Sequence, residues 1–455
     1  MTESANFPIS VNSDAATGHL IRESISFEKI KGKNIETLIV GGGIEGMSAA
    51  YQLRKQDFLL CELSESLGGT SGMNTFKDSS FAQGAHYDLA YPDYYGEEVL
   101  QLFEELNIIK KLPWRNAWGF VDQEHIITHR RKNHCYIDGI RRKDVLAKGD
   151  LKNNFLELIS PYLGQMTLPT RLIKNELQAL NQIDFISFLS KELALTPEFI
   201  RGLDYHMKDD YGGEADKISA LAGIHYFMCR PYYNEIVELF SPPEGNYYFI
   251  DKMKNAVNPD QLLTSHLVSQ IKETTQGFEI SVVDVKQRVV KSIKAKNIIY
   301  AGNKHALKYI YPQDYNLFEK TVYSPWMVVN VVVNEDLPLP GYWLNEMLTS
   351  DSSLMGFIDS ATQHRKSGQD RVLTAYYCLP PESREDLINA ERNKAIIAEN
   401  TIKHIGNYFD EDITPKVKAV SIKAMGHAMP MPTKGYLFDD KNQYRKNKNI
   451  AYAGV

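Results

Sequence analysis

The pattern of apolar and polar positions around residue 40 predicts a strand, a tight turn, a helix and a second strand. Residues 36–40 (ETLIV) form a short β-branched run, so we expect a strand that begins at Glu36. Glycine-rich residues 41–46 follow, then a helical pattern to about Lys55, and then the apolar run of residues 58–61. This order of elements predicts a βαβ unit with glycines at its first turn.

Further along the chain the pattern changes from helical to strand-like and back. Residues 94–240 are mostly helical, whereas strand-like runs return at 261–307. Residues 327–333 (MVVNVVV) predict a buried strand, and residues 384–408 predict another helix. Residues 1–34 are polar and rich in Ser, Asn and Thr, so we expect an arm laid loosely over the surface. Together these elements predict an α/β fold with a second domain of mixed sheet and helix.

The glycine turn has the spacing that a bound dinucleotide requires. Gly41 is suited to the tight turn, Gly43 to a close approach of a pyrophosphate, and Gly46 to close packing of the helix on the strand. Ile44 and Glu45 open the helix, whose N-terminus carries partial positive charge toward the phosphates. A bare GxGxxG string is a weak signal, but a position between a predicted strand and a predicted helix makes it specific.

Glu62 ends the second predicted strand. A carboxylate at that point accepts hydrogen bonds from a ribose diol and repels a 2′-phosphate, so NADP is disfavoured. The alternative interpretation is a glycine-rich loop followed by an ordinary surface glutamate.

A second glycine-rich stretch decides between NAD and FAD. Paired glycines shortly after the ribose carboxylate let another loop pass close to the pyrophosphate and the ribityl chain, which suits an extended FAD. We therefore expect FAD as the cofactor. The residues expected to contact it in this stretch are Gly68, Gly69, Thr70, Gly84, Ala85 and His86.

Composition and charge exclude several other functions. The chain has 455 residues, of which 43% are hydrophobic and 24% charged, which suits two interleaved domains around a small-molecule substrate. A net charge of −6 without a long basic run argues against nucleic acid. The four cysteines are far apart, which argues against a disulfide framework and a zinc site. No signal peptide or bilayer-spanning run is visible, so we expect a cytoplasmic protein; peripheral membrane contact and a homodimer stay open.

Several separate segments resemble the flavin-containing amine oxidase superfamily, which also holds protoporphyrinogen oxidases, phytoene desaturases and spermidine dehydrogenase. The segments are GGGIEGMSAAYQL with Glu62, ESLGGTSG, FAQGAHYD, SPPEGNYYFIDKM and KNIIYAGNKHAL. The resemblance implies a Rossmann-like FAD-binding domain that is assembled from discontinuous segments. It also implies that Val268 presents its backbone to the adenine, and that Ala301 and Gly454 lie beside the cofactor.

The same resemblance divides the chain into domains. An N-terminal arm of residues 1–34 precedes an FAD-binding domain, and a substrate domain completes the chain. The FAD-binding domain is expected at residues 35–95, 241–310 and 420–455, and the substrate domain at residues 96–240 and 311–419.

Two positions depart from the family pattern. The GG motif usually continues with an arginine near the phosphates or the flavin, and Thr70 stands there instead. The family's last motif continues from Ala-Gly to an acidic residue and a helix, whereas this sequence ends at Val455 directly after Gly454. We therefore expect the missing positive charge either to come from elsewhere in the fold or to be absent. From the end at Val455 we expect a truncated chain with weakened flavin affinity.

The segments DYHMKDDYGG, SALAGIHYF, YSPWMVVN and GHAMPMP resemble a bacterial branch near spermidine dehydrogenase. That resemblance does not identify a substrate. The candidate catalytic residues are His427, which precedes the terminal strand, and Asp210 and Tyr211, which could attract a cationic amine. A packing histidine and a solvated or helix-capping Asp pair are the alternatives for these positions. His225, Tyr226 and Trp326 are weaker candidates.

Three functions stay open at this point. The first is an FAD-dependent oxidoreductase that transfers a hydride from an amine C–N bond, in a polyamine-like or amino-acid-like substrate, to flavin N5. The second is carbon–carbon desaturation of an isoprenoid or a porphyrinogen. The third is a truncated, catalytically inactive binding protein with a flavin fold.

Overall fold

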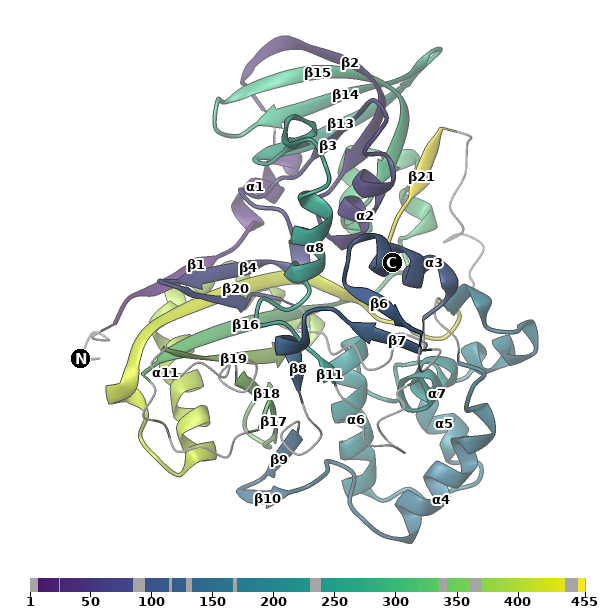
Figure 1. The fold of residues 1–455 in the computed structure, drawn as a ribbon, viewed down its shortest axis with the longest axis vertical. Helices are drawn as coiled ribbons and strands as arrows, with labels where there is room; N and C mark the ends of the chain where they lie inside the picture. The colour runs from purple at the N-terminus through teal and green to yellow at the C-terminus, as the bar shows by residue number, and fades with distance from the viewer. Residues whose placement is uncertain are drawn as a thin grey trace.

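The computed structural model organises the chain around two large β-sheets, one above the other in Figure 1. The residues that it describes are 7–23, 25–84, 95–113, 117–127, 133–166, 170–229, 239–334, 337, 342–359, 370–437 and 449–454. Of the expected site residues, Ala85 and His86 lie outside this part of the chain. No helix in these ranges is both long and apolar enough to cross a bilayer.

The upper sheet has seven strands from three distant parts of the chain (Figure 1). Its strands are β2 (Glu28–Val40), β3 (Phe58–Cys61), β12 (Leu262–Leu263), β13 (His266–Thr274), β14 (Gly277–Asp284), β15 (Val289–Tyr300) and β21 (Ile450–Tyr452). β2 pairs in parallel with β3 and β15, and β15 pairs in parallel with β21. The assembly of a Rossmann-like sheet from discontinuous segments is therefore confirmed.

Helix α2 (Ile44–Gln52) covers this sheet directly after the glycine turn. Met47 and Ala50 are fully buried and pack with Ile39 of β2 and Leu60 of β3. Because β2 and β3 run in parallel with Val40 opposite Cys61, both strands end at the same edge of the sheet. The residues that follow the two strands are thereby brought together.

The lower sheet has eight strands. In spatial order these are β1 (Ile9–Asn12), β20 (Val417–Pro430), β16 (Tyr323–Val333), β19 (Arg371–Cys378), β18 (Leu354–Asp359), β17 (Leu344–Leu348), β9 (Asn133–Ile137) and β10 (Ile140–Arg142). Every residue of β16 is buried, which confirms the predicted buried strand. One face of the sheet packs on helix α11 (Ala390–Phe409) through residues such as Val329, Phe357 and Ile405.

A helical block lies beside the lower sheet (Figure 1). Its helices are α4 (Asp150–Ile159), α5 (Phe185–Leu189), α6 (Pro197–Tyr211) and α7 (Ala220–Met228). Phe155, Phe199 and Phe227 form its core. Helix α6 has a regular start, because the Thr196 hydroxyl accepts a hydrogen bond from the Phe199 N–H, and it ends at Gly212 in the left-handed conformation.

Shorter elements connect the two sheets and the helical block. They are α1 (Ala15–His19), β4 (Met73–Phe76), β5 (Ser79–Ala82), α3 (Glu97–Glu105), β6 (Ile109–Leu112), β7 (Ala117–Phe120), β8 (Ile126–Ile127), β11 (Leu239–Phe240), α8 (Tyr247–Lys254), α9 (Leu307–Ile310) and α10 (Arg384–Ile388). Short 3-10 helices are η1 (Leu20–Arg22), η2 (Gly69–Ser71), η4 (Gln123–His125), η6 (Ser160–Tyr162), η7 (Thr170–Leu172), η8 (Asn175–Gln182), η10 (Pro259–Gln261), η11 (Lys304–Ala306), η12 (Pro312–Leu317), η14 (Pro381–Ser383) and η15 (Thr414–Lys416).

The structure corrects three expectations about the chain's organisation. The prediction that residues 1–34 form a loose arm is wrong. Within this stretch β1 pairs in parallel with β20, and the strand expected to begin at Glu36 already begins at Glu28. The assignment of residues 420–455 to the FAD-binding domain is also wrong in part, since β20 belongs to the lower sheet and only β21 joins the upper one. Residues 94–240 are less helical than expected, because β9 and β10 extend the lower sheet. Polar composition hid β1, whose backbone pairing does not depend on side-chain hydrophobicity.

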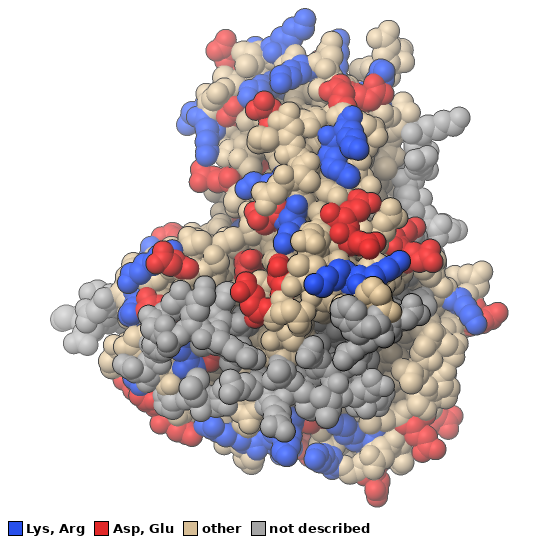
Figure 2. All heavy atoms as spheres, in the orientation of Figure 1, with Lys and Arg blue, Asp and Glu red and all other residues tan. Residues whose placement is uncertain are grey.

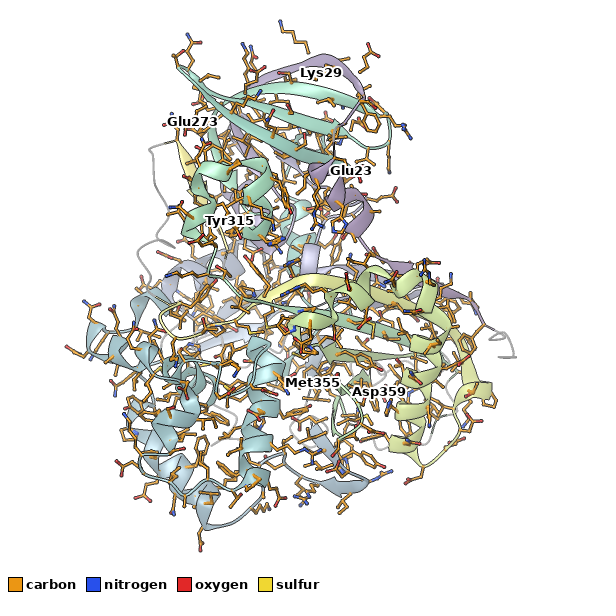
Figure 3. The ribbon with its side chains drawn as sticks, turned by 180° about the vertical axis from the view of Figure 1, so that it is seen from behind. Glu23, Lys29, Glu273, Tyr315, Met355 and Asp359 are labelled. Carbon is orange, nitrogen blue, oxygen red and sulfur yellow. The ribbon has the colours of Figure 1, made fainter. Side chains whose placement is uncertain are left out.

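Charges of both signs are interspersed over the face seen in Figure 2. The view from behind in Figure 3 places Glu23, Lys29 and Glu273 around the upper sheet, and Met355 and Asp359 on the lower sheet. The described cysteines Cys61, Cys135, Cys229 and Cys378 are buried and form no disulfide with one another.

Candidate cofactor and substrate site

The glycine turn between β2 and α2 is shaped by close backbone contacts. Gly41 has a φ of +101°, and a Cβ on it would lie 2.9 Å from the Ala301 carbonyl oxygen. A Cβ on Gly46 would lie 1.9 Å from the Gly41 carbonyl oxygen, so only glycine fits there. Gly43 directly precedes α2. A Cβ on Gly43 would lie 3.3 Å from the Glu45 carboxylate, which is the nearest group. The turn therefore leaves the backbone at Gly43 open to a ligand at the helix N-terminus.

Glu62 is buried against this turn. Its Oε2 accepts a hydrogen bond from the Gly42 N–H at 2.6 Å, and its Oε1 accepts one from the Ser64 N–H at 2.8 Å. Burial raises the pKa of the Glu62 carboxyl, and the N–H groups of Ser64 and Gly42 oppose that rise. Each oxygen keeps one further lone pair, so the carboxylate is oriented to accept hydrogen bonds from a diol.

The paired glycines pack directly on the turn. Gly68 has a φ of +126° and Gly69 a φ of +55°, and the Gly68 N–H donates to the Gly42 carbonyl at 2.8 Å. A Cβ on Gly84 would lie 1.6 Å from the Thr70 carbonyl oxygen, so the segment that follows β5 crosses this loop in close contact. Gly69 and Thr70 themselves are exposed. The two glycine-rich segments therefore form one surface at the edge of the upper sheet.

A buried lysine lies at this edge, and the sequence did not point to it. Lys304 is 2% exposed, and its ammonium donates to the carbonyl oxygens of Ala453 and of Gly302. Burial lowers its pKa to about 8, while the negative charge of Glu45 opposes that change. Glu45 packs against Gly454, on which a Cβ would lie 2.7 Å from the Glu45 Cγ. The available signal in the sequence is that Lys304 belongs to KNIIYAGNKHAL, one of the segments that carry the family resemblance.

The last strand of the upper sheet begins beside Glu62. β13 pairs with β14 alone among the described strands, and the pairing shifts register after Val268. The His266 N–H donates to the Glu62 carbonyl at 2.8 Å, which holds the start of β13 beside the end of β3. The backbone of Val268 therefore lies on an open edge near Glu62, and the role of Val268 at the adenine stays a prediction. Ala301 donates to the Val40 carbonyl at 2.8 Å and closes the turn from the other side.

Asn330 is a further polar residue that sequence reasoning passed over. It is fully buried on β16, and its Nδ2 donates to the Ala82 carbonyl at 2.8 Å and to the Thr374 hydroxyl at 3.0 Å. Its Oδ1 has no hydrogen-bond partner within the described residues. Leaving such an acceptor unpaired costs about 1–3 kcal/mol. Asn330 is the single polar residue in the apolar run MVVNVVV, and this was the available sign in the sequence of a buried polar group.

The candidate catalytic residues do not form one cluster. The His427 ring stacks on the His305 ring with centroids 4.2 Å apart, and burial lowers the pKa of His427 to about 3. Asp210 and Tyr211 end α6, and the Tyr211 ring lies 6.4 Å from that of Tyr226. Histidine 427 is therefore neutral at ordinary pH, and no described ring contact joins His427 to Tyr211. The roles of these three residues stay predictions.

The weaker candidates lie around the end of α6. A Cβ on Gly212 would lie 2.5 Å from Ser324 Cβ and 3.5 Å from the Trp326 indole nitrogen, so this helix end presses on β16. The Tyr226 hydroxyl is 2.8 Å from His206 Nδ1, and His225 lies on the same helix, α7. Trp326 thus belongs to the lower sheet, whereas Tyr226 belongs to the helical block.

Comparison with known proteins agrees with this geometry. The family model described as NAD(P)-binding Rossmann-like domain matches residues 39–106. A search of curated proteins found no match.

Solved structures are similar over almost the whole chain. A putative protoporphyrinogen oxidase from Exiguobacterium sp. 255-15 has 14% identity and a TM-score of 0.65, with 93% of this chain and 94% of that chain covered. Putrescine oxidase bound to putrescine has 13% identity and a TM-score of 0.60, over 92% of this chain and 93% of that one. Cyclohexylamine oxidase from Brevibacterium oxydans IH-35A has 13% identity and a TM-score of 0.59, over 92% of each chain. The resemblance read from the sequence is therefore confirmed at the level of the fold.

Proposed function

We propose that this chain, whose fold is that of the flavin-containing amine oxidases, is an FAD-dependent oxidoreductase that oxidises a C–N bond of an amine. The observation that carries the cofactor assignment is the convergence of two glycine-rich segments, the buried carboxylate of Glu62 and the buried ammonium of Lys304 at one sheet edge. These groups match the chemical parts of a dinucleotide: a diphosphate and a ribose diol.

Each part of the cofactor has a residue suited to it. The N-terminus of α2 and Lys304 supply positive charge to the diphosphate, and Glu62 accepts hydrogen bonds from the adenosine ribose. The open edge at Val268 supports hydrogen bonding to the adenine. Lys304 takes the place of the arginine that Thr70 replaces in the family pattern.

FAD, when bound, accepts a hydride from the carbon beside the amine nitrogen. The chain's own contribution is to hold the amine and to exclude water. From Met425 to Pro430 β20 is only half-buried, whereas residues 419–424 are buried, so this end of the strand supports a ligand-facing surface. Trp326 and Tyr376 stack with ring centroids 6.3 Å apart on the same sheet and suit a cationic or apolar amine.

The cofactor assignment is tested with Glu62→Gln and the matched control Glu65→Gln. Glu65 is a neighbouring glutamate whose side chain is 82% exposed. Purified protein is titrated with FAD, and binding is followed by flavin fluorescence and by absorbance near 370 and 450 nm, roughly where flavins absorb. We expect Glu62→Gln to weaken FAD binding on the order of tenfold, because a charged acceptor is replaced by a weaker one, with no change for Glu65→Gln. Wild-type protein that is colourless and cannot be reconstituted would overturn the assignment.

The reaction is tested by anaerobic reduction of the bound flavin. Alkylamines, polyamines and amino acids are compared with polyprenes and porphyrinogens, and bleaching at 450 nm is recorded. Asp210→Asn and Tyr211→Phe test the end of α6, with Asp216→Asn as a control at a 51%-exposed aspartate that pairs with Lys217. Reduction by amines alone supports the proposal, and reduction by polyprenes or porphyrinogens alone overturns it.

A further inference from the structure

Basic side chains from five separate elements converge beside the end of β20. They are Arg22 of η1, His305 of η11, Lys308 of α9, Arg384 of α10 and His427 of β20. The charges of Arg22, Lys308 and Arg384 each lower the pKa of both histidines, after the larger effect of burial. No described acid raises the pKa of His305. These five residues, the basic cluster, therefore produce a local positive potential.

Backbone groups hold one side of the basic cluster in place. The Arg384 Nε donates to the Gly426 carbonyl at 2.8 Å, and its Nη2 donates to the Tyr323 carbonyl. The side-chain amide of Asn303, which directly precedes η11, donates to the His427 carbonyl at 2.9 Å. Arg384 and η11 are thereby attached to the same end of the lower sheet.

Aromatic rings position the remaining groups. The rings of His305 and His427 are stacked, with centroids 4.2 Å apart. The Arg22 guanidinium and the Lys308 ammonium both lie over the Tyr309 ring, 5.5 and 4.9 Å from its centroid. Two cations that share one ring repel each other, so an anion beside them is favoured.

Most hydrogen-bond donors of the basic cluster are unused. Within the described residues, Arg22 and Lys308 donate no hydrogen bond, and the ring nitrogens of His305 and His427 have no hydrogen-bond partner. Arg384 uses only two of its three nitrogens there. None of these remaining nitrogens is fully buried. A ligand can therefore reach several N–H donors at once.

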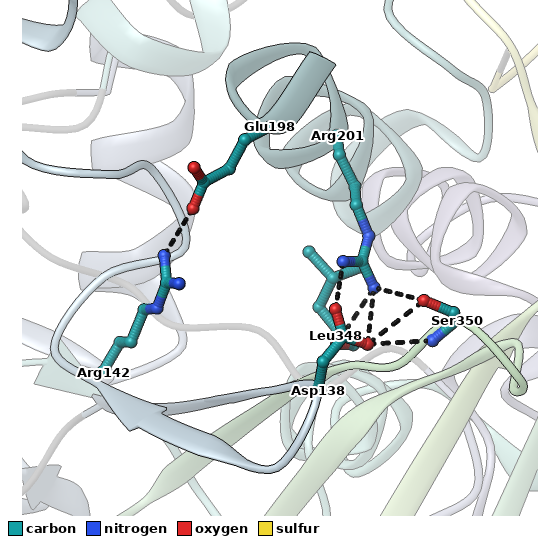
Figure 4. Close-up of polar contacts among 6 residues, drawn as sticks. All are labelled: Asp138, Arg142, Glu198, Arg201, Leu348 and Ser350. Atoms are coloured by element: carbon teal, nitrogen blue, oxygen red, sulfur yellow. Dashed lines mark hydrogen bonds and ion pairs between the residues drawn. The ribbon is translucent and has the colours of Figure 1, made fainter. Parts of the chain in front are cut away.

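Arg201 of α6 illustrates how a basic side chain is usually paired. Figure 4 shows it bound to Asp138 by two hydrogen bonds. Arg384 has no such partner in the part of the chain that the structure describes. The charge of Glu382 acts on Arg384, but the two residues form no ion pair. The positive charge of the basic cluster is therefore left for a ligand to balance.

The basic cluster and the phosphate turn use different side chains, although the two are joined in the sequence. Lys304 turns its ammonium to the Ala453 carbonyl, at the edge of the upper sheet. The next residue, His305, turns to β20 instead and stacks on His427. The diphosphate proposed at the N-terminus of α2 therefore does not account for the basic cluster.

We propose that the basic cluster binds a phosphate group of a small molecule other than the bound FAD. A phosphate dianion offers three strong acceptor oxygens, which suit a guanidinium, an ammonium and imidazoles around it. A monovalent carboxylate leaves more of the positive charge unbalanced. The proposal does not depend on the oxidation of an amine.

Calorimetric titration of the FAD-loaded protein with inorganic phosphate tests the proposal, at constant ionic strength and with acetate as the monovalent comparison. We expect Arg22→Gln and Lys308→Gln each to weaken phosphate binding about fivefold to tenfold, since each removes one charge-assisted contact. Arg142→Gln is the matched control, because Arg142 already pairs with Glu198 at 2.7 Å, and it should change the affinity by less than about twofold. A wild type that binds phosphate no better than acetate, or an equal loss in the control, would overturn the proposal.

Lys308→Arg provides a variant with an intact charge. Its affinity for phosphate should stay within about threefold of the wild type, because the guanidinium also pairs with phosphate. A loss as large as that of Lys308→Gln contradicts an electrostatic contact. FAD content and thermal unfolding are recorded for every variant, so that lost recognition is separated from a folding defect.

Phosphorus NMR gives an independent readout, the protonation of the bound anion. The positive charge of the basic cluster favours the dianion, so bound phosphate should lose its proton at a lower pH than phosphate in solution. The nearby acids that oppose this effect are Glu382, and Glu23 next to Arg22. A bound signal that titrates at the same pH as phosphate in solution contradicts the proposal.

Titration with and without FAD distinguishes two sources of the phosphate group. Phosphate binding that FAD leaves unchanged supports a separate ligand. If saturation with FAD abolishes it, the basic cluster belongs to the cofactor site, and the proposal fails while the proposed oxidoreductase stands. If phosphate binds but no amine reduces the flavin, amine oxidation fails and the phosphate site stands.

Discussion

The two ends of the candidate site are built in different ways. At the edge of the upper sheet the groups come mainly from one stretch of chain, residues 41–84, and they contact one another through backbone atoms. On the face of the lower sheet they are the side chains of Trp326 on β16 and Tyr376 on β19, which are far apart in the sequence. The first arrangement suits a cofactor of constant shape, whereas the second can vary its side chains without changing the fold.

The two regions also differ in the partners of their buried charges. At the upper edge the buried charges of Glu62 and Lys304 have backbone partners, which orient them for a ligand. On the lower sheet Arg371 and Asp359 form a buried ion pair, while Glu346 has only a thiol. Removing one partner of a buried ion pair destabilises the fold, because the other charge is left buried and uncompensated.

Gly46→Ala should have the largest effect, because it breaks the backbone contact on which the upper edge depends. The added Cβ would lie 1.9 Å from the Gly41 carbonyl oxygen. We expect FAD binding to be lost and the free energy of unfolding to fall by at least about 3 kcal/mol, measured by FAD titration and urea unfolding. Gly426→Ala on the lower sheet is the control, since nothing lies within 4 Å of its Cβ position. If both variants lowered FAD binding and the free energy of unfolding equally, the proposed difference between the two regions would be contradicted.

Asp359→Asn tests the paired charges of the lower sheet. Arg371 is 3% exposed and donates to Asp359 and to the Leu337 carbonyl. Losing the Asp359 carboxylate therefore leaves a buried guanidinium without its anionic partner. We expect a loss of about 3–5 kcal/mol in urea unfolding. The exposed pair Glu391–Lys394 on α11 is the control, and Glu391→Gln should change stability by less than about 0.5 kcal/mol. A neutral Asp359→Asn would show that this pair does not stabilise the sheet.

Lys304→Met separates a ligand-directed charge from a structural one. Without FAD the pKa of Lys304 is about 8, below its ordinary 10.5, so the folded state binds the proton less tightly than the unfolded state. The cost of the charge, about 3 kcal/mol, is present below pH 8 and is relieved as the pH rises from 8 to 10.5.

Wild-type stability without FAD should therefore rise over that range relative to Lys304→Met, in urea unfolding at several pH values. FAD affinity of Lys304→Met should fall about tenfold and lose part of its salt dependence. The exposed Lys320→Met is the control. Unchanged FAD affinity would mean that Lys304 serves the fold alone.

His427→Gln should have the smallest effect at neutral pH. Burial lowers the pKa of His427 to about 3 and that of His305 to about 4, so both rings are neutral above pH 6.5. Because the unfolded chain protonates first, wild-type stability falls as the pH drops from 6.5 toward 4. Removing His427 should relieve about 1 kcal/mol of that loss by pH 5, after allowance for its partial exposure. Identical pH profiles of unfolding, or a flavin-reduction rate that requires protonated His427, would contradict this account.

The upper sheet was largely predictable because its signals are local. The glycine spacing, the apolar runs on either side and Glu62 lie within one short stretch, and the structure places them as the βαβ pattern predicts. The start of β2 at Glu28 was missed because residues 28–34 are polar and owe their conformation to backbone pairing with β15. Lys304 was missed because nothing in its local sequence shows that it folds back on Ala453.

The sequence by itself determined the βαβ unit, the position of the Glu62 carboxylate at the end of its second strand and the α/β class, because these depend on periodicity and on short spacings. Only the tertiary structure decided which distant residues share a surface. The placement of Glu346 beside Cys135 and across Gly356 from Tyr376 follows from strand order and register. Register is set by packing of the whole sheet against α6 and α11, so no local pattern could reveal it.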